Sequence, residues 1–196
     1  VQGEGGVYVC TKEFLTGLRK LCDERDIALI LDEVQCGMGR TGTIMTYFQY
    51  DILPDILCLA KGIGAGFPMG AFVANKKFAA AMEPGDHGST YGGNPMAGQA
   101  CRTVFKILED TKMIDHVQDI SEYLIEKLDD LQEEFPCIKE RRGLGLMIGL
   151  EFDKPVKDIV KTCLDLGLIV VTAGPHVVRM LPPFITNEKD VDQAIA

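Results

Sequence analysis

Two charged residues, Asp32 and Lys61, each end an apolar stretch of the sequence. The run ALIL precedes Asp32, and the run ILCLA precedes Lys61. Continuous apolar runs of this length are typical of buried parallel strands, whose carboxyl ends lie at one edge of a sheet. An amine that can form a Schiff base, beside a carboxylate that can face a pyridine nitrogen, predicts a site for pyridoxal 5'-phosphate.

Both residues also fit other interpretations. An apolar strand ending in Asp-Glu is the Walker B pattern that holds magnesium in nucleotide hydrolases. Nucleotide hydrolases need a Gly-Lys-Ser/Thr loop, and residues 1–196 contain none. A loop of this kind upstream of Val1 would keep this alternative open. Lys61 on its own could be a solvated lysine at the end of a strand. The apolar residues before it and the glycines after it instead favour a partly desolvated, nucleophilic amine.

Three further groups could take part in binding. Ser89 and Thr90 lie in a glycine-rich loop, which suits phosphate oxygens but could equally be an ordinary turn. Arg179 stands among apolar residues and therefore needs a carboxylate partner, either a substrate or a nearby glutamate. None of the three histidines has a second histidine or a cysteine at the spacing of metal ligands, so no metal site is expected.

Composition narrows the functional class. The chain has 196 residues, 46% of them hydrophobic, and a net charge of -9, so a folded core is expected and a nucleic-acid-binding surface is not. Seven cysteines without a CxxC pair indicate reduced thiols. With no long apolar run and no leader sequence, no membrane association and a cytoplasmic location are expected.

The pattern of apolar residues predicts an α/β protein in two parts. We expect strands and helices to alternate up to about residue 110, giving a parallel sheet covered by helices on both faces. A smaller α+β part is expected after that point. The predicted helices cover residues 11–26, 44–50, 76–82, 96–109, 112–135, 156–166 and 191–196, and the predicted strands cover residues 27–31, 56–60, 71–74, 146–152, 168–171 and 177–180.

Several of these segments together resemble one known family. The stretch LILDEVQCGMGRTG, then LAKGIGAGFPMGA, HGSTYGGNP, RRGLGLMIGLEF and VVRMLPPF, is similar to the class III, fold type I, pyridoxal-phosphate aminotransferases. The resemblance implies that residues 1–110 are the carboxyl-terminal part of the large cofactor-binding domain, with a mostly parallel sheet, and that residues 111–196 are a small α+β domain. It covers about the second half of such an enzyme, so the chain is expected to be a fragment.

The resemblance also implies a role for each candidate residue. Lys61 would hold the cofactor and move a proton, Asp32 would face the pyridine nitrogen, and Gln35 would contact the phenolic oxygen. Thr90, next to Ser89, would reach the phosphate bound by the other subunit of a homodimer. Arg179 would bind the substrate's α-carboxylate, and Glu4 would pair with this arginine during one half-reaction.

The glycine-rich segments look more like the acetylornithine branch of the family than the ornithine branch. This likeness implies transfer of the δ-amino group of N-acetylornithine to 2-oxoglutarate. Cys36 and Arg141 depart from the usual pattern without touching the chemistry. Three alternatives stay open: an aminotransferase for ornithine or another ω-amino acid, a catalytically silent structural or dimerisation fragment, and a nucleotide hydrolase.

Overall fold

The computed structural model describes residues 1–196, which form two compact units. The first, which we call the three-stranded unit, contains residues Cys10–Gly39 and Thr43–Lys112. The second, the four-stranded unit, contains Val1–Val9, Arg40–Gly42 and Met113–Ala196. The units are therefore not two consecutive stretches of sequence, and the assignment of residues 1–110 and 111–196 to two domains stays a prediction.

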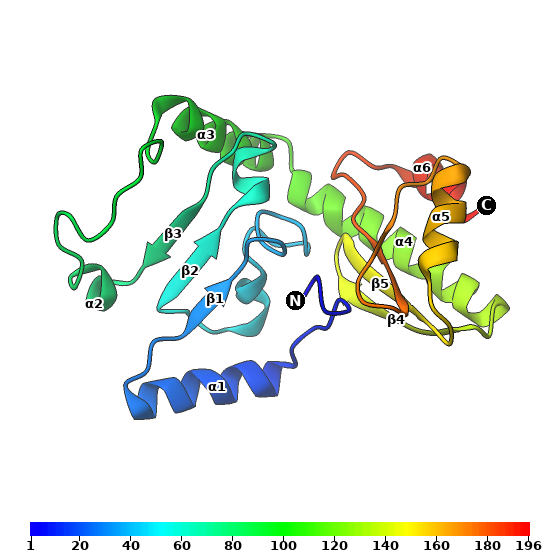
Figure 1. Ribbon diagram of the computed structural model, residues 1–196, viewed down its shortest axis with the longest axis horizontal. Coiled ribbons are helices and arrows are strands. Elements are labelled where there is room, and N and C mark those ends of the chain that lie inside the picture. Colours follow the sequence, from blue (N-terminus) through cyan, green and yellow to red (C-terminus); the bar gives the residue numbers. More distant parts are fainter. The chain divides into compact units, whose positions relative to one another are not determined.

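The three-stranded unit consists of one small sheet with helices around it (Figure 1). The pattern of apolar residues predicts all three of its strands, with different bounds for β1 and β2 and the same bounds for β3. Its elements are α1 (Lys12–Arg25), β1 (Ile30–Asp32), the 3-10 helix η1 (Thr46–Tyr50), β2 (Ile56–Leu59), the 3-10 helix η2 (Lys61–Gly64), β3 (Ala71–Ala74), α2 (Lys76–Ala79) and α3 (Pro95–Asp110).

The sheet of this unit is mixed rather than parallel. The strand order is β1-β2-β3, with β1 parallel to β2 and β3 antiparallel to β2. A parallel return usually takes a crossover that contains an α-helix, whereas residues 60–70 contain only the short helix η2 and a glycine-rich turn. The prediction of a parallel sheet is therefore wrong for β3 and correct for β1 and β2.

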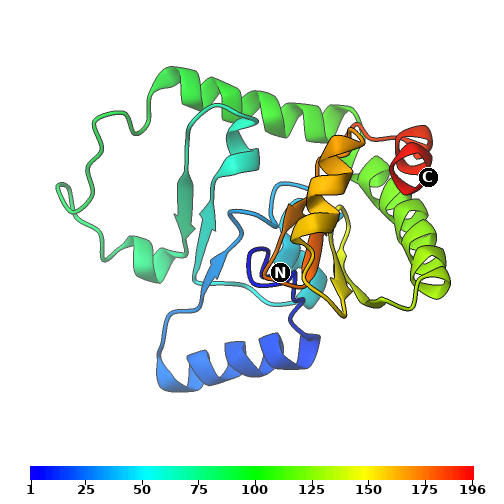
Figure 2. The same cartoon turned by 45° about the vertical axis from the view of Figure 1, so that its right-hand side comes forward.

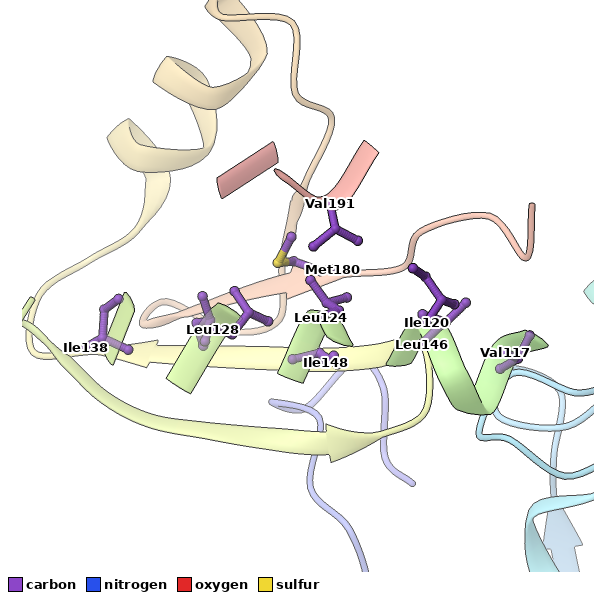
Figure 3. Close-up of a cluster of buried hydrophobic side chains, with 10 residues drawn as sticks. Val117, Ile120, Leu124, Leu128, Ile138, Leu146, Ile148, Met180 and Val191 are labelled. Carbon is purple, nitrogen blue, oxygen red and sulfur yellow. The ribbon is translucent and has the colours of Figure 1, made fainter. Parts of the chain in front are cut away.

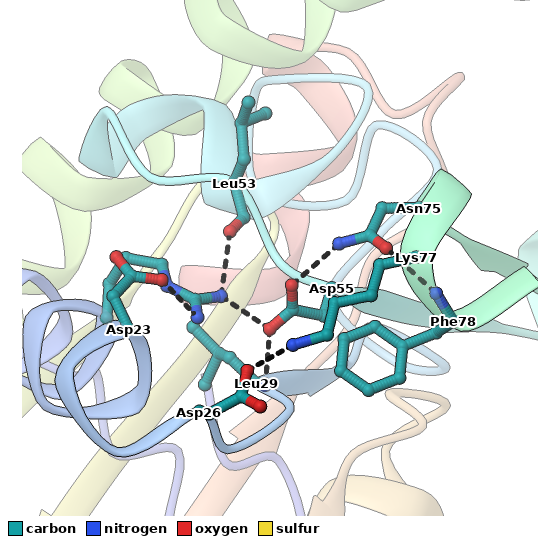
Figure 4. A network of polar contacts seen from close by, with 9 residues as sticks. Asp23, Asp26, Leu29, Leu53, Asp55, Asn75, Lys77 and Phe78 are labelled. Carbon is teal, nitrogen blue, oxygen red and sulfur yellow. Dashed lines mark hydrogen bonds and ion pairs between the residues drawn. The ribbon is translucent and has the colours of Figure 1, made fainter.

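The start of β1 is fixed by a side chain, Asp55, that lies just before β2. One oxygen of its carboxylate accepts hydrogen bonds from the backbone N–H of Leu29 (2.8 Å) and from Arg19 (2.8 Å), and the other accepts one from Asn75 (2.7 Å). Figure 4 shows Asp55 at the centre of these contacts. The N–H of Leu29 is taken by this carboxylate, and the N–H of Ile27 donates to the carbonyl of Cys22 in α1, so regular strand pairing begins at Ile30 and not at residue 27, where the sequence predicts it.

The four-stranded unit holds an antiparallel sheet in the order β4-β5-β7-β6. Figure 2 shows this unit from a second side. The sequence predicts each of its helices and strands in approximate position except β4, which carries four charges in seven residues. Its elements are α4 (Met113–Glu134), β4 (Ile138–Leu144), β5 (Met147–Phe152), α5 (Lys157–Asp165), β6 (Val171–Thr172), β7 (Val177–Met180) and α6 (Glu188–Ile195).

One face of this sheet builds the main hydrophobic core of the unit. Side chains of α4, β5, β7 and α6 meet there, among them the fully buried Leu124, Leu128 and Ile148 (Figure 3). The apolar residues of α4 recur at spacings of three and four, which places them on the side of the helix that faces the sheet. None of the helices in the chain combines the length and the apolarity that a membrane span requires.

Candidate functional site

Asp32 is the last residue of β1 and its side chain is exposed. In the parallel ladder it pairs with Cys58 of β2. Its Oδ1 accepts a hydrogen bond of 2.9 Å from the backbone N–H of Val34, which orients the carboxylate at the carboxyl edge of the sheet. A solvent-facing carboxyl group in this place can accept a further hydrogen bond from a ligand.

Lys61 lies at the same edge, because it follows β2 and β2 runs parallel to β1. Its backbone has φ of 47°, in the left-handed region that residues other than glycine rarely adopt. Such strain is concentrated at functional sites. The expected crowding around the amine is absent, since Lys61 is exposed in this chain. The glycines after it leave the amine open, so these residues alone do not desolvate it.

The glycine after Lys61 is closely packed. A Cβ placed on Gly62 would lie 3.2 Å from the Cβ of Met38, which belongs to the loop that follows β1. The next residue, Ile63, is buried and donates its N–H to the carbonyl of Ala60 over 3.1 Å. The segment after β2 is thereby held against the loop after β1, and the two candidate residues belong to one packed edge.

Glu33, which the sequence analysis did not single out as a site residue, fixes the loop that carries Gln35. Its side chain is 4% exposed and accepts hydrogen bonds from the backbone N–H groups of Thr46 (2.6 Å) and Tyr47 (2.8 Å) at the start of η1. Burial raises the pKa of this carboxyl, and the two backbone donors act against that rise. The sequence position of Glu33 gives a hint of this role. An acid directly after a buried strand is either exposed to solvent or buried with hydrogen-bond donors.

Ser89 and Thr90 lie in the exposed loop before α3. The Ser89 Oγ accepts a hydrogen bond of 3.0 Å from the backbone N–H of Gly92, so its hydroxyl stabilises the turn. The hydroxyl of Thr90 makes no hydrogen bond. Asn94 caps α3 by accepting the N–H of Ala97 over 2.9 Å. No hydrogen bond or ion pair joins Ser89 or Thr90 to Asp32 or Lys61.

Arg179 and Glu4 form an ion pair in the four-stranded unit. Arg179 lies in β7 with a side chain only 8% exposed, and its Nη1 donates to Glu4 Oε1 over 2.9 Å. The side chain of Glu4 is 70% exposed. The sequence leaves open whether the carboxylate partner of Arg179 is a substrate or a glutamate, and in this structure it is Glu4. The pair brings together residues 175 positions apart.

Glu4 is presented by a closed loop, residues 2–8, which we call the amino-terminal loop. Its two ends are joined by an isolated antiparallel bridge between Gln2 and Tyr8, with the Gln2 N–H 2.8 Å from the Tyr8 carbonyl oxygen. The candidate residues thus fall into two groups. Asp32, Gln35 and Lys61 belong to the three-stranded unit, whereas Glu4 and Arg179 belong to the four-stranded unit.

Comparison with known proteins gives one family over the whole chain. The family model "Aminotransferase class-III" matches residues 1–196. The acetylornithine aminotransferase of Clostridium acetobutylicum is 46% identical over 196 residues, and that of Methanocaldococcus jannaschii is 46% identical over 195 residues. These matches cover 100% of this chain but only 51% and 49% of the two relatives.

Solved structures agree with this result. An ornithine δ-aminotransferase of Plasmodium falciparum superposes with a TM-score of 0.93 at 32% identity, over 100% of this chain and 51% of that one. An N-acetylornithine aminotransferase of Stenotrophomonas maltophilia gives a TM-score of 0.88 at 36% identity, over 100% of this chain and 52% of that one. The chain therefore spans about half the length of the proteins that it matches.

Proposed function

Since this chain belongs to the class-III aminotransferases, we propose that its residues serve an aminotransferase that moves the δ-amino group of N-acetylornithine to 2-oxoglutarate. The observation that carries the proposal is the placement of Asp32 and Lys61 at one edge of the parallel β1–β2 pair. A lysine amine and an exposed carboxylate at this edge suit the two ends of one aromatic ring. The family depends on pyridoxal 5'-phosphate. The amine of Lys61 suits the aldehyde of this cofactor, and the carboxylate of Asp32 suits its pyridine nitrogen.

The cofactor, when bound, supplies an electron sink for the charge that develops on the substrate carbon. In the proposed site, the carboxylate of Asp32 would accept a hydrogen bond from the pyridine nitrogen and favour its protonated form. The amine of Lys61 would hold the cofactor covalently and would serve as the base that moves the proton of the substrate carbon. Gln35 donates to the phenolic oxygen.

Other residues complete the proposal. Thr90, with Ser89 supporting its turn, contacts the phosphate held by a second copy of the enzyme, so we propose a homodimer. The exposure of Thr90, whose hydroxyl makes no hydrogen bond here, supports this role. We also propose a cytoplasmic location, because the sequence holds seven cysteines and no CxxC pair, a pattern that indicates reduced thiols.

Arg179 and Glu4 are proposed to handle the substrates' carboxylates. A buried guanidinium binds a planar α-carboxylate through two parallel hydrogen bonds. With Glu4 on Arg179, as observed, that site is closed to a carboxylate, and a substrate that carries one has to displace Glu4. The exposed glutamate can leave without an uncompensated charge, since its side chain already faces water.

A second candidate substrate is ornithine itself. Solved ornithine aminotransferases share 31% to 32% identity with this chain and solved acetylornithine aminotransferases 29% to 36%, while the two curated acetylornithine aminotransferases named above reach 46%. The higher identity favours N-acetylornithine. The two donors differ in an acetyl group on the α-nitrogen, so a comparison of their kcat/KM values separates the two assignments.

The cofactor assignment is tested by reduction with borohydride in the presence of pyridoxal phosphate, followed by peptide mapping. The test uses this chain and, separately, an enzyme of full family length that carries the same sequence. The adduct is expected on Lys61 in the longer enzyme and is lost in Lys61→Ala, but not in Lys77→Ala, which alters an exposed lysine paired with Asp26. An adduct on any other lysine would refute the assignment. A longer enzyme that shows the adduct but no transamination would favour a structural role.

A further inference from the structure

A row of three residues crosses the middle of the four-stranded sheet. Arg142 of β4 pairs with Gly149 of β5, which in turn pairs with Arg179 of β7. Directly paired residues of an antiparallel sheet present their side chains on the same face. The residues beside this row in β5, Ile148 and Leu150, lie in the hydrophobic core on the other face. The two arginines therefore lie on the face opposite α4, with a glycine between them.

The amino-terminal loop lies over that glycine. A Cβ on Gly149 would come within 3.0 Å of the Cβ of Val7 and 3.1 Å of a methyl group of Val177. Val7 is fully buried and has φ of 60°. The absence of a side chain at position 149 thus allows the loop to approach the sheet between Arg142 and Arg179.

Arg142 binds this loop at two points. Its Nε donates a hydrogen bond of 2.7 Å to the carbonyl oxygen of Gly6, and its guanidinium lies 4.1 Å from the centre of the Tyr8 ring. Its Nη1 contacts the carboxylates of Glu140, at 2.7 Å, and Glu151. The side chain is only 8% exposed. The two carboxylates fix the guanidinium, and the guanidinium in turn fixes the stretch that begins two residues after Glu4.

The relative strength of the two arginine contacts decides which of them holds the loop. The Glu4 side chain is 70% exposed, so water screens its ion pair with Arg179 and solvates the carboxylate when Glu4 leaves. The contact of Arg142 with Gly6 is buried and charge-assisted, which makes it the stronger one. Glu4 can therefore leave Arg179 while the loop stays in place.

We propose that Arg142 is a positioning residue that holds Glu4 within reach of Arg179 by binding Gly6 and Tyr8. The inference rests on the proposed function in one respect, namely that the Glu4–Arg179 pair controls the access of substrate carboxylates. Arg142 itself touches neither substrate nor cofactor in this assignment. It sets the resting position to which Glu4 returns, and so the ease with which a carboxylate competes for Arg179.

The neighbouring arginine provides a matched control. Arg141 is the next residue on β4, points to the other face of the sheet and forms an ion pair with Asp129 of α4. The variants Arg142→Met and Arg141→Met each remove one guanidinium that is bound to carboxylate. Only the first is expected to affect the amino-terminal loop. Arg142→Lys keeps the charge and tests for partial rescue.

The first readout is hydrogen exchange of residues 2–8 in the cofactor-loaded enzyme, which does not depend on activity. Arg142→Met is expected to speed exchange in this loop about tenfold or more, because it removes a buried charge-assisted hydrogen bond. Arg142→Lys is expected to lie between this variant and the parent. Unchanged exchange in Arg142→Met, or an equal change in Arg141→Met, would overturn the proposal.

The second readout is the ratio of kcat/KM for 2-oxoglutarate to kcat/KM for the amino donor. Arg142→Met is expected to shift this ratio in the same direction as Glu4→Gln by about threefold or more, and the double variant to shift it no further than Glu4→Gln alone. Fully additive shifts would refute a shared action. If Glu4→Gln leaves the ratio unchanged while exchange still rises in Arg142→Met, the hold on the loop stands and the proposed role of the Glu4–Arg179 pair fails.

Discussion

Asp32 and Glu33 are adjacent at the end of β1 and lie in opposite environments. Asp32 is exposed at the carboxyl edge of the sheet, whereas the carboxylate of Glu33 is buried against the backbone N–H groups of Thr46 and Tyr47. The alternating direction of side chains along an extended chain separates the two carboxylates. One of them faces solvent, where a ligand can reach it, and the other fixes the loop behind it.

The buried carboxylate gives the first prediction. Glu33→Gln is expected to lower the free energy of unfolding by about 1–3 kcal/mol at neutral pH, because the amide nitrogen of glutamine would face a backbone N–H that needs an acceptor. Denaturant titration measures this difference. Glu109→Gln, on the exposed end of α3, is the control and is expected to change stability little. Equal effects of the two substitutions would contradict the role assigned to Glu33.

The same residue predicts a pH dependence. Because burial raises the pKa of Glu33 above its ordinary value of 4.5, its stabilising contribution is complete below that pH and declines as the pH rises through the raised pKa. The stability difference between the parent and Glu33→Gln should therefore shrink from acidic to neutral pH. Unfolding titrations of both proteins across this range test the sign, and a difference that grows with pH would be inconsistent with it.

Asp55 should show the opposite pH dependence. The backbone N–H of Leu29, above all, and then Arg19 and Asn75 hold the pKa of this carboxyl below its ordinary value of 3.8. Its contribution is therefore present above that value and is lost as the pH falls through the lowered pKa. Asp55→Asn is expected to lose about 1–3 kcal/mol at neutral pH and to be less sensitive to acid than the parent.

Asp51 offers a matched control for this experiment. Its carboxylate also pairs with a cation, Lys12, but both side chains are exposed. Asp51→Asn is therefore expected to change the unfolding free energy much less than Asp55→Asn. If the two substitutions were equally costly, the network around Asp55 would not be the feature that fixes the start of β1.

The sequence predicts well the elements whose burial follows a simple period. The apolar faces of α1 and α4 and the runs before Asp32 and Lys61 are all found as helices and strands. It fails at β4, because the sequence IKERRGL carries four charges that find partners only in three dimensions. Arg141 pairs with Asp129 on one face of the strand, and Arg142 pairs with Glu140 and Glu151 on the other.

The residues of the candidate site likewise fall into those that the local sequence pattern predicts and those whose contacts only the tertiary structure shows. Asp32 and Lys61 are found from local pattern alone, since each follows an apolar run. The contact of Arg179 with Glu4 and the hold of Arg142 on Gly6 join residues more than 130 positions apart. No period or spacing within a strand encodes such contacts. The tertiary structure shows both contacts, whereas the resemblance to a family implies only the pairing of Arg179 with Glu4.

The close approach of the amino-terminal loop to the sheet gives another prediction. Gly149→Ala is expected to destabilise the fold by about 1–3 kcal/mol, because its Cβ would press against Val7 and Val177 in a tightly packed place. Gly17→Ala, in α1, meets no atom within 4 Å and should stabilise the helix by about 0.5–1 kcal/mol. Denaturant titration of the two variants should therefore give opposite signs, and a neutral Gly149→Ala would show that the loop yields easily.

The backbone of Lys61 leads to a final prediction that separates stability from function. Its φ of 47° is costly for any residue with a Cβ, so Lys61→Gly should be more stable than Lys61→Ala by roughly 1 kcal/mol. At Lys76, the first residue of α2, the order should reverse, since glycine weakens a right-handed helix. Both Lys61 variants should lose the borohydride-reducible adduct, whereas both Lys76 variants should keep it. If Lys61→Gly is more stable than Lys61→Ala and forms no adduct, the backbone strain at this position is a cost in stability that the function of the lysine amine requires.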